Sequence, residues 1–241
     1  MHIKNINLFT QKYPSKKHYP FNLDIFQQTP IVKFYSPITF FIGENGTGKS
    51  TLLKAIALKC GIHIWGDAKS CYKANPYSEI LYEFMKVNWT LDKVSGSYFD
   101  SELSRTFAQY LDEWAESDPD VFKYFGGKSL LTQSHGQSLM SYFTSRYKIK
   151  GVYFLDEPET ALSPKNQLKL LKLFQKTGEK GHAQFIIATH SPILLACPNA
   201  DIYNFDSLPL KRITYEKTQH YQTYKSFFSD RSKFLDNRSE L

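Results

Sequence analysis

Long apolar runs alternate along the chain with segments whose apolar residues recur every three or four positions. Ile38–Ile42, Val152–Leu155 and Gln184–Ala188 are almost continuous apolar runs, as is typical of strands buried on both faces of a sheet. Ser50–Cys60 follows the first run with helical spacing, and Lys165–Lys176 has the same spacing between the other two. This alternation predicts an α/β fold with a mainly parallel sheet that helices cover on both faces.

Shorter elements are expected towards both ends of the chain. Strands are predicted over Ile3–Leu8 and Ile31–Tyr35, in a region interrupted by prolines. Ile202–Phe205 and Arg212–Tyr215 are candidates for late strands. A final helix is expected through Tyr221–Phe228.

The middle of the chain is less regular and is expected to be mostly helical. Asn75-Pro76 predicts the start of a helix that continues to Met85, and another helix is expected over Leu139–Arg146. A further helix is predicted from five apolar residues that share one face, namely Leu103, Phe107, Tyr110, Leu111 and Trp114. We therefore expect a single domain over residues 1–241, with a core lobe at about 1–66 and 148–241 and a helical lobe at about 67–147.

Composition is that of a folded chain with a basic balance. Of the 241 residues, 41% are hydrophobic and 22% are charged, which argues against disorder. Thirty Lys and Arg against 23 Asp and Glu give a net charge of +7, which permits an anionic partner. The three cysteines are far apart and predict neither a disulfide framework nor a zinc site. No signal peptide and no apolar run of about 18–20 residues is present, so we expect a cytoplasmic protein without membrane insertion.

A glycine-rich loop connects the first apolar run to the first helix. Its residues, Gly43-Glu44-Asn45-Gly46-Thr47-Gly48-Lys49-Ser50, fit the pattern G-x4-G-K-[ST]. Glycines let backbone N–H groups converge on phosphate oxygens, and the positive end of the following helix faces the same phosphates. We expect the phosphates of a nucleotide to contact Gly43, Asn45, Gly46, Thr47, Gly48, Lys49, Ser50 and Thr51.

Two acids, Asp156 and Glu157, follow the second apolar run. A buried parallel strand delivers such residues to the edge of the sheet where ligands bind. We expect Asp156 to hold Mg²⁺ together with the Ser50 hydroxyl, and Glu157 to take the proton from the attacking water. Two surface acids at the end of an ordinary strand are the alternative interpretation, which the nearby phosphate loop disfavours.

His190 ends the third apolar run. A histidine at the exit of a core strand can contact the γ-phosphate and orient the water, although a lone histidine is more often structural. Ser134-His135-Gly136-Gln137 precedes the helix over Leu139–Arg146. By itself this segment is a weak signal, and a capped surface helix is the more common explanation of such a segment.

The order of these segments resembles that of ABC-type ATPases. Phe41–Gly46, Gln133–Gly136, Leu155–Glu159 and Ile187–Leu194 are also similar to small stand-alone bacterial ATPases, which are usually labelled as AAA-family although their motifs are ABC-like. The resemblance implies a P-loop NTPase fold, binding of ATP and Mg²⁺, and hydrolysis of ATP to ADP and phosphate. It also implies a homodimer with two-fold symmetry, in which residues 134–137 of one chain contact the ATP held by the other.

Three positions depart from the ABC pattern. His135 stands where glycine is usual, and Ser163 stands where the loop after the catalytic acid usually ends in Asp. A glutamine that normally links the lobes and completes the Mg²⁺ site has no clear equivalent. By similarity of Gly96–Glu102 to the pattern of the small ATPases, Glu102 is the candidate, with a helix N-terminal acid as the equal alternative.

Several functions are compatible with this resemblance. The first is an ATP-gated dimeric switch that acts on a protein or nucleic-acid partner in defence, nucleic-acid metabolism or a toxin–antitoxin-like module. The second is the nucleotide-binding subunit of an ABC transporter. The third is a non-hydrolysing, nucleotide-dependent DNA-binding or structural module. Only 85 residues separate Lys49 from Ser134 (134 − 49), which excludes a long coiled coil of the SMC type.

The helix that follows Glu159 carries a basic stripe. Its four lysines are spaced by four, three and four residues, namely Lys165, Lys169, Lys172 and Lys176. Leu168, Leu171 and Phe174 are predicted to form the opposite, buried side. A solvated face is the default interpretation, and contact with a nucleic-acid backbone is the alternative.

Overall fold

A computed structural model of the chain describes residues 1–64, 75–101, 104–124, 127, 129 and 135–235. These residues form a six-stranded sheet with the strand order β5-β6-β7-β3-β8-β9, which is parallel except for β9. In sheet order, the strands are Gly96–Asp100, Gly151–Asp156, Ala183–Ala188, Ile38–Ile42, Asp201–Asn204 and Lys211–Arg212. The prediction of a mainly parallel sheet is confirmed.

A second, antiparallel sheet has the strand order β2-β1-β4, over Ile31–Lys33, Ile3–Leu8 and Met85–Trp89. The predicted helix from Asn75 to Met85 is wrong. A short 3-10 helix, η2, spans Leu81–Phe84, and the chain then enters β4. Strand β4 pairs with β1, which lies about 80 residues earlier in the sequence, and this non-local pairing prevails over the local helical spacing.

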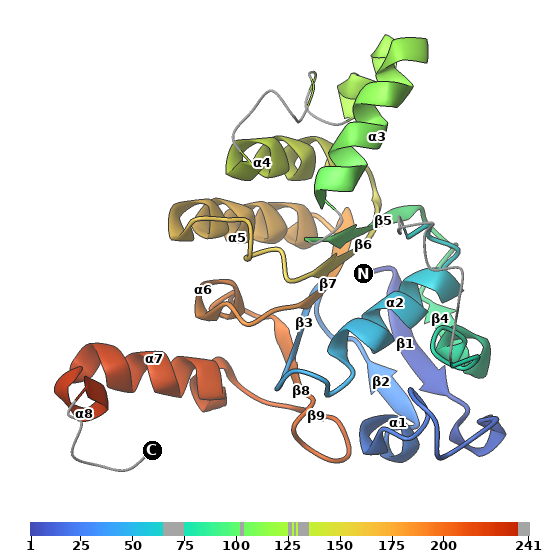
Figure 1. Cartoon of the computed structure of the whole chain (residues 1–241), viewed down its shortest axis with the longest axis vertical. Coiled ribbons are helices and arrows are strands. Elements are labelled where there is room, and N and C mark those ends of the chain that lie inside the picture. The colour runs from blue at the N-terminus through green and yellow to red at the C-terminus, as the bar shows by residue number, and fades with distance from the viewer. Residues whose placement is uncertain (65–74, 102–103, 125–126, 128, 130–134, 236–241) are drawn as a thin grey trace.

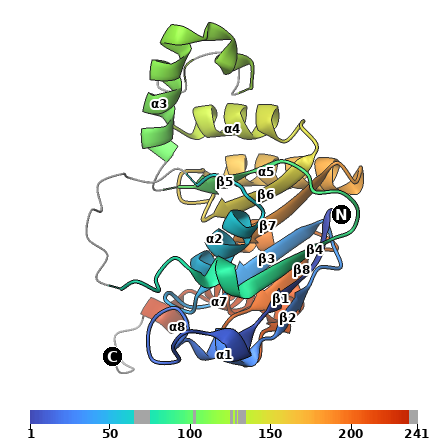
Figure 2. The ribbon, with the colours of Figure 1, turned by 90° about the vertical axis from the view of Figure 1, so that its right-hand side faces the viewer.

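Helices lie against both faces of the large sheet (Figures 1 and 2). Helix α2, over Lys49–Lys59, lies between the two sheets, where its apolar residues share a core with Phe41, Phe154 and Ile186. Neighbouring strand residues point to the opposite face, where Phe40 and Leu155 share a second core with α4, α5 and α6. These three helices span His135–Arg146, Pro164–Glu179 and Pro192–Leu195.

The remaining elements surround this framework. Helix α1 spans Asp24–Gln28 and the 3-10 helices η1 and η4 span Thr10–Lys12 and Tyr215–Lys217. Helices α7 and α8, over Gln219–Ser229 and Ser232–Leu235, lead away from β9 in Figure 1. No helix in the described part of the chain has the length and apolar character to cross a membrane.

Helix α3, over Ser104–Ser117, and the 3-10 helix η3, over Pro119–Tyr124, stand at one end of the molecule. The predicted helix in this region is confirmed. Leu111 and Ala115 are buried, whereas Tyr110 and Trp114 are 42% and 52% exposed, so its apolar face is only partly covered. The side chains of the other two residues in that prediction, Leu103 and Phe107, lie outside the described set.

The predicted helical lobe at about 67–147 is too wide. Residues 85–89 belong to the small sheet, and residues 96–100 form the edge strand of the large sheet. Among the described residues, the helical part of this region is therefore confined to η2 and to α3, η3 and α4. The segment of α3 to α4 enters the sequence between β5 and β6, which are neighbours in the sheet.

Candidate functional site

The carboxyl ends of the parallel strands bring the sequence motifs to one edge of the large sheet. Asp100 pairs in register with Asp156, Asp156 pairs with Ala188, and Ala188 pairs with Phe41. The loops that follow these residues therefore lie side by side. The glycine-rich loop after β3, the acids after β6 and His190 after β7 all belong to this edge.

The glycine-rich loop leads from β3 directly into α2. Gly48 is the N-cap of α2, with a φ of 100°. A Cβ atom there would lie 2.9 Å from Cζ of Phe26, so both the backbone conformation and the space require glycine. Gly46 also has a positive φ, of 82°, and faces open space. The first turn of α2 directs backbone N–H groups without intrahelical partners towards this loop, as a phosphate site requires.

Lys49 is bound inside the loop that it follows. Its Nζ donates to the carbonyl oxygens of Gly43, at 2.6 Å, and Glu44, at 2.9 Å, and the residue is only 5% exposed. Burial lowers the pKa of the ammonium, whereas nearby carboxylates, Glu157 foremost, act in the opposite direction. A buried cation held by two carbonyls can transfer to phosphate oxygens with little loss of hydrogen bonding.

Ser50 and Asp156 meet at the predicted metal position. The Ser50 hydroxyl donates to Oδ1 of Asp156 at 2.9 Å, and the Tyr98 hydroxyl donates to Oδ2 at 2.9 Å. Burial raises the pKa of Asp156, although both hydrogen bonds favour its ionised form. A carboxylate and a hydroxyl are hard oxygen donors on a fixed strand and helix, and this donor set fits Mg²⁺ completed by water and phosphate oxygens.

Glu157 has an unusual backbone conformation directly after β6. Its φ is 47°, a left-handed conformation that costs a non-glycine residue about 1–2 kcal/mol. Its backbone N–H donates to the carbonyl oxygen of Ala188 at 2.9 Å, which holds it beside β7. The side chain is 40% exposed, and its Oε1 lies 3.9 Å from Nε2 of His190. This strained turn aims the carboxylate away from the core, where water can reach it.

His190 is held by two partners. Its backbone N–H donates to Oε1 of Glu159 at 2.6 Å, and its Nδ1 lies 3.2 Å from Nε2 of His220 on α7. Within the described part of the chain, Nε2 of His190 and Oε2 of Glu159 are buried without a hydrogen-bond partner. Burial lowers the pKa of both His190 and His220 and raises the pKa of Glu159. A buried nitrogen without a partner, at the same edge as Lys49, is suited to a phosphate or water ligand.

Comparisons with known proteins agree with this arrangement. Residues 128–196 match a family described as "AAA domain, putative AbiEii toxin, Type IV TA system". Residues 1–71 match a second family, described as "AAA domain". The two matches contain between them the glycine-rich loop, the acids after β6 and His190. Among curated proteins, none matches the sequence.

Two solved structures have a similar fold over nearly the whole chain. An SMC head bound to the C-terminal winged-helix domain of ScpA covers 90% of this chain and 99% of its own, at 12% identity and a TM-score of 0.54. A metal-chelate type ABC transporter in an inward-facing conformation covers 93% and 88%, at 19% identity and a TM-score of 0.51. The chain therefore has the fold of the P-loop NTPases of the ABC type. The fold class expected from the sequence is therefore confirmed.

The signature-like segment lies at the start of α4. Ser134 lies outside the described residues, as does Glu102, and the side chain of His135 is not described. A Cβ atom on Gly136 would lie 3.2 Å from Nδ2 of Asn166 and 3.5 Å from the carbonyl oxygen of Ala161. Gly136 therefore packs against the start of α5, and Gln137 is exposed.

Ser163, which stands where the ABC pattern usually has aspartate, has a local structural role. Ser163 is the N-cap of α5, and its side chain accepts a hydrogen bond from the backbone N–H of Asn166 at 3.4 Å. Both serine and aspartate are good N-cap residues. The departure from the ABC pattern at this position therefore leaves the start of α5 capped.

Several polar groups at the site were not found from the sequence. Tyr98 and His220 are described above, and Asp206 accepts the backbone N–H of Glu44 at 2.9 Å. The Tyr19 hydroxyl forms a hydrogen bond with Thr51, at the start of α2. All four come from segments whose approach to the loop depends on tertiary packing. Their residue types alone give no signal.

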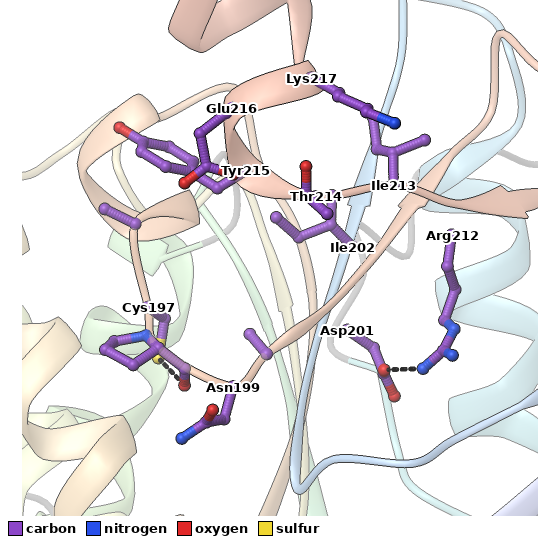
Figure 3. Close-up of a pocket in the computed structure, with 13 residues that line it drawn as sticks. Cys197, Asn199, Asp201, Ile202, Arg212, Ile213, Thr214, Tyr215, Glu216 and Lys217 are labelled. Carbon is purple, nitrogen blue, oxygen red and sulfur yellow. Dashed lines mark hydrogen bonds and ion pairs between the residues drawn. The ribbon is translucent and has the colours of Figure 1, made fainter.

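A hollow of about 590 Å³ lies away from these motifs, beside β8, β9 and the loop before β8 (Figure 3). Two of the four charged residues in its lining, Asp201 and Arg212, form an ion pair with each other. Arg212 donates from Nη1 to Oδ1 of Asp201 at 2.6 Å, and Oδ2 of Asp201 accepts the backbone N–H groups of Tyr35 and Ser36. This cluster ties β8 and β9 to the start of β3.

Proposed function

We propose that this chain binds ATP with Mg²⁺ at the sheet edge and hydrolyses it to ADP and phosphate. The observation that carries the proposal is the 2.9 Å hydrogen bond between Ser50 and Asp156, with the ammonium of Lys49 held in the adjoining loop. A phosphate cradle and a pair of hard oxygen donors at the carboxyl ends of neighbouring strands are the two components of a site for a nucleotide with its metal.

The phosphate-binding groups come from one continuous segment. Backbone N–H groups of residues 43–51 would surround the phosphates, and Lys49 would exchange its two carbonyl partners for β- and γ-phosphate oxygens. Ser50 and Asp156 would hold Mg²⁺, and Glu102 is a further candidate ligand. The metal ion supplies neutralisation of charge on the phosphate oxygens.

The reacting groups come from the ends of β6 and β7. The exposed carboxylate of Glu157 would accept the proton of the attacking water. His190, whose Nε2 lies 3.9 Å from that carboxylate, would contact the γ-phosphate and fix the position of the water. The backbone N–H of Glu157 donates to the carbonyl oxygen of Ala188, and the backbone N–H of His190 donates to the carboxylate of Glu159. These hydrogen bonds hold the two side chains next to each other at the ends of adjacent strands.

We further propose that ATP joins two copies of the chain. Ser134, His135, Gly136 and Gln137 at the start of one α4 would contact the γ-phosphate held by the second copy. Gln137 is exposed at the start of α4, so a second chain can reach it, which supports this arrangement. The dimer would act as a switch for a protein partner in defence, nucleic-acid metabolism or a toxin–antitoxin-like module. The family match over residues 128–196, whose description includes a toxin–antitoxin system, supports that choice.

Three measurements on four proteins test this proposal: ATP binding by calorimetry, phosphate release, and molar mass by light scattering with and without ATP. The proteins are the wild type, Lys49→Ala, Glu157→Gln and the control Lys59→Ala, which changes an exposed lysine at the end of the same helix. We expect Lys49→Ala to lose ATP binding. Glu157→Gln is expected to keep binding, to slow phosphate release about 10²–10⁴-fold, and to accumulate as an ATP-bound dimer.

Different failures would reject different parts of the proposal. If Lys49→Ala binds and hydrolyses ATP as Lys59→Ala does, the nucleotide site is wrong. If Glu157→Gln binds ATP but stays monomeric at micromolar concentration, the dimer is wrong while the nucleotide site stands. If Glu157→Gln hydrolyses ATP at the wild-type rate, the assignment of the base is wrong.

A further inference from the structure

An open groove of about 540 Å³ runs between α4 and α5, on the outer face of the helical layer. One wall is the hydroxyl-bearing face of α4, which includes Ser145, and the other wall carries Lys169, Lys172 and Lys176 of α5. Met140 and Leu173 are the apolar residues of the lining. Three of the four lysines in the basic stripe therefore line the same groove. A helix face that is merely solvated does not need its lysines to share a groove.

The two segments that form the groove carry as much net positive charge as the whole chain. Residues 135–150 and 164–182, which comprise α4, α5 and the residues that follow each, contain eight Lys and Arg and a single acid, Glu179. Their excess of 8 − 1 = +7 equals the net charge of the full chain, 30 − 23 = +7. The remaining segments are balanced, so the basic character of the protein is concentrated on these two helices.

The groove lysines are exposed and have no carboxylate partner in the described part of the chain. Lys54 and Arg212, by contrast, pair with Asp100 and Asp201. One predicted feature of α5 is corrected: Leu168 is 50% exposed, and the buried side of the helix consists of Leu170, Phe174 and Gly178. The lysine side thus faces solvent along the whole helix.

We propose that this groove binds the phosphate backbone of a nucleic-acid duplex. The three lysines span seven residues of α5, which is roughly 10 Å along the helix axis, and duplex DNA presents about one charge every 1.7 Å of its own axis. The groove lining includes no aromatic residue, so it lacks the stacking platform that binds the bases of single strands. Contact with the backbone alone predicts binding without sequence preference.

The position of the groove connects it to the signature-like segment. The same α4 that forms one wall begins at His135, and Gly136 packs against Asn166 of the same α5 that forms the other wall. A duplex that contacts both helices would hold α4 in a fixed orientation on α5. Binding in the groove does not require ATP hydrolysis, so it can be tested whether or not the proposed activity is correct.

The test measures fluorescence anisotropy of a labelled duplex of about 30 base pairs, of mixed sequence, without nucleotide and over a range of salt concentrations. The test variant is the full-length chain with Lys169→Gln, Lys172→Gln and Lys176→Gln together. Its matched control carries Lys4→Gln, Lys33→Gln and Lys86→Gln, three exposed lysines of the small sheet. Both variants lose three charges, so bulk charge affects them equally.

We expect the wild type and the small-sheet variant to bind the duplex with similar affinity. The groove variant is expected to bind at least about tenfold more weakly, and its salt slope, log K against log salt, should be smaller by about 2–3 because three phosphate contacts are lost. Ser145→Arg, which adds a cation to the facing wall, should tighten binding. This gain cannot arise from misfolding, so the test does not depend on loss of function alone.

Three outcomes would overturn the proposal. Equal loss of affinity in the two triple variants would show that net charge, and not the groove, attracts the duplex. Tighter binding of a single strand of the same length, or of phosphatidylserine vesicles, would assign the groove to another partner. Absence of duplex binding by the wild type at low salt would reject the site outright.

Discussion

The rings of His190 and His220 meet at 3.2 Å, between Nδ1 of the first and Nε2 of the second. Only one of these nitrogens can carry the shared proton, so the tautomer of one ring determines that of the other. When His220 donates, His190 carries its own proton on Nε2, the atom that faces Glu157 at 3.9 Å. Helix α7, which carries His220, thereby influences whether Nε2 of His190 is a hydrogen-bond donor.

His220 is therefore expected to be a positioning residue. His220→Phe should lower kcat about 10-fold or more, as is typical when the partner of a functional histidine is lost, with little change in KM for ATP. His220→Gln, which keeps a donor group, should retain more activity. Steady-state kinetics of both variants test this, with exposed His63→Gln as the control. Equal activity of the Phe and Gln variants would show that the hydrogen bond is unimportant.

Stability is expected to depend on the ionisation of these two rings. Burial is the main cause that lowers the pKa of each ring. The charge of Lys49 also lowers the pKa of His190, and the charge of His190 also lowers that of His220. Glu44 and Asp206 act in the opposite direction on both rings. Between the lowered pKa values and about 6.5, the unfolded chain binds more protons than the folded chain. The stability that comes from the neutral rings is therefore full above about pH 6.5 and falls as the pH decreases.

Thermal unfolding at about pH 7.5 and 5.5 measures this effect. The wild type should lose more of its Tm on acidification than His220→Gln does, because the variant has one fewer buried imidazole to protonate. Buried acids such as Asp156 and Glu159, whose pKa values are raised, favour the opposite trend in both proteins. The difference between the two proteins isolates the histidine, and an identical fall in Tm would contradict the prediction.

Tyr98 is expected to support the metal site through Asp156. Tyr98→Phe removes the 2.9 Å hydrogen bond to Oδ2 and should lower the free energy of unfolding by about 1.5–3 kcal/mol, the usual contribution of a hydrogen bond to a charged group. The Mg²⁺ concentration for half-maximal ATPase activity should also rise. Tyr82→Phe, a partly buried tyrosine against the same core, is the control. An unchanged Mg²⁺ dependence would separate Tyr98 from the metal site.

The cap at Ser163 gives a prediction about stability. Ser163→Ala should lower the free energy of unfolding by about 1 kcal/mol, since the first turn of α5 loses its side-chain acceptor. Ser163→Asp should restore stability, because aspartate caps equally well. Chemical denaturation measures both variants. If Ser163→Ala is as stable as the wild type but changes ATPase activity, the residue serves the subunit interface instead of the cap.

The central strands could be predicted from the sequence because a strand that is buried on both faces is a nearly continuous apolar run, as in Gly151–Asp156. Strand β3, helix α2 and the glycine-rich loop between them could be predicted together, and α5 could be predicted from its helical spacing. Strand β4 could not be found this way, because its identity depends on pairing with β1 across the fold. The helical lobe was predicted too wide for the same reason, because β4 and β5 are identified by their pairing with distant strands.

The candidate site shows a similar division. Lys49, Ser50, Asp156 and Glu157 follow a spacing that reflects the strand–loop geometry, and the structure places them at one edge. Their supporting groups, such as Tyr98 and His220, come from an edge strand and from the terminal helix. No periodicity links these distant segments to the loop, so only the packed chain reveals the contacts.

The placement of α3 and α4 between two adjacent strands has a mechanical consequence. The chain leaves the sheet after Asp100, whose carboxylate pairs with Lys54 of α2 at 3.4 Å, and it returns through Gly151 at the start of β6. Both anchor points belong to the strand pair that ends at Asp156. A rotation of these helices would therefore pull on the ion pair between Lys54 and Asp100, and through it on the helix that follows the glycine-rich loop.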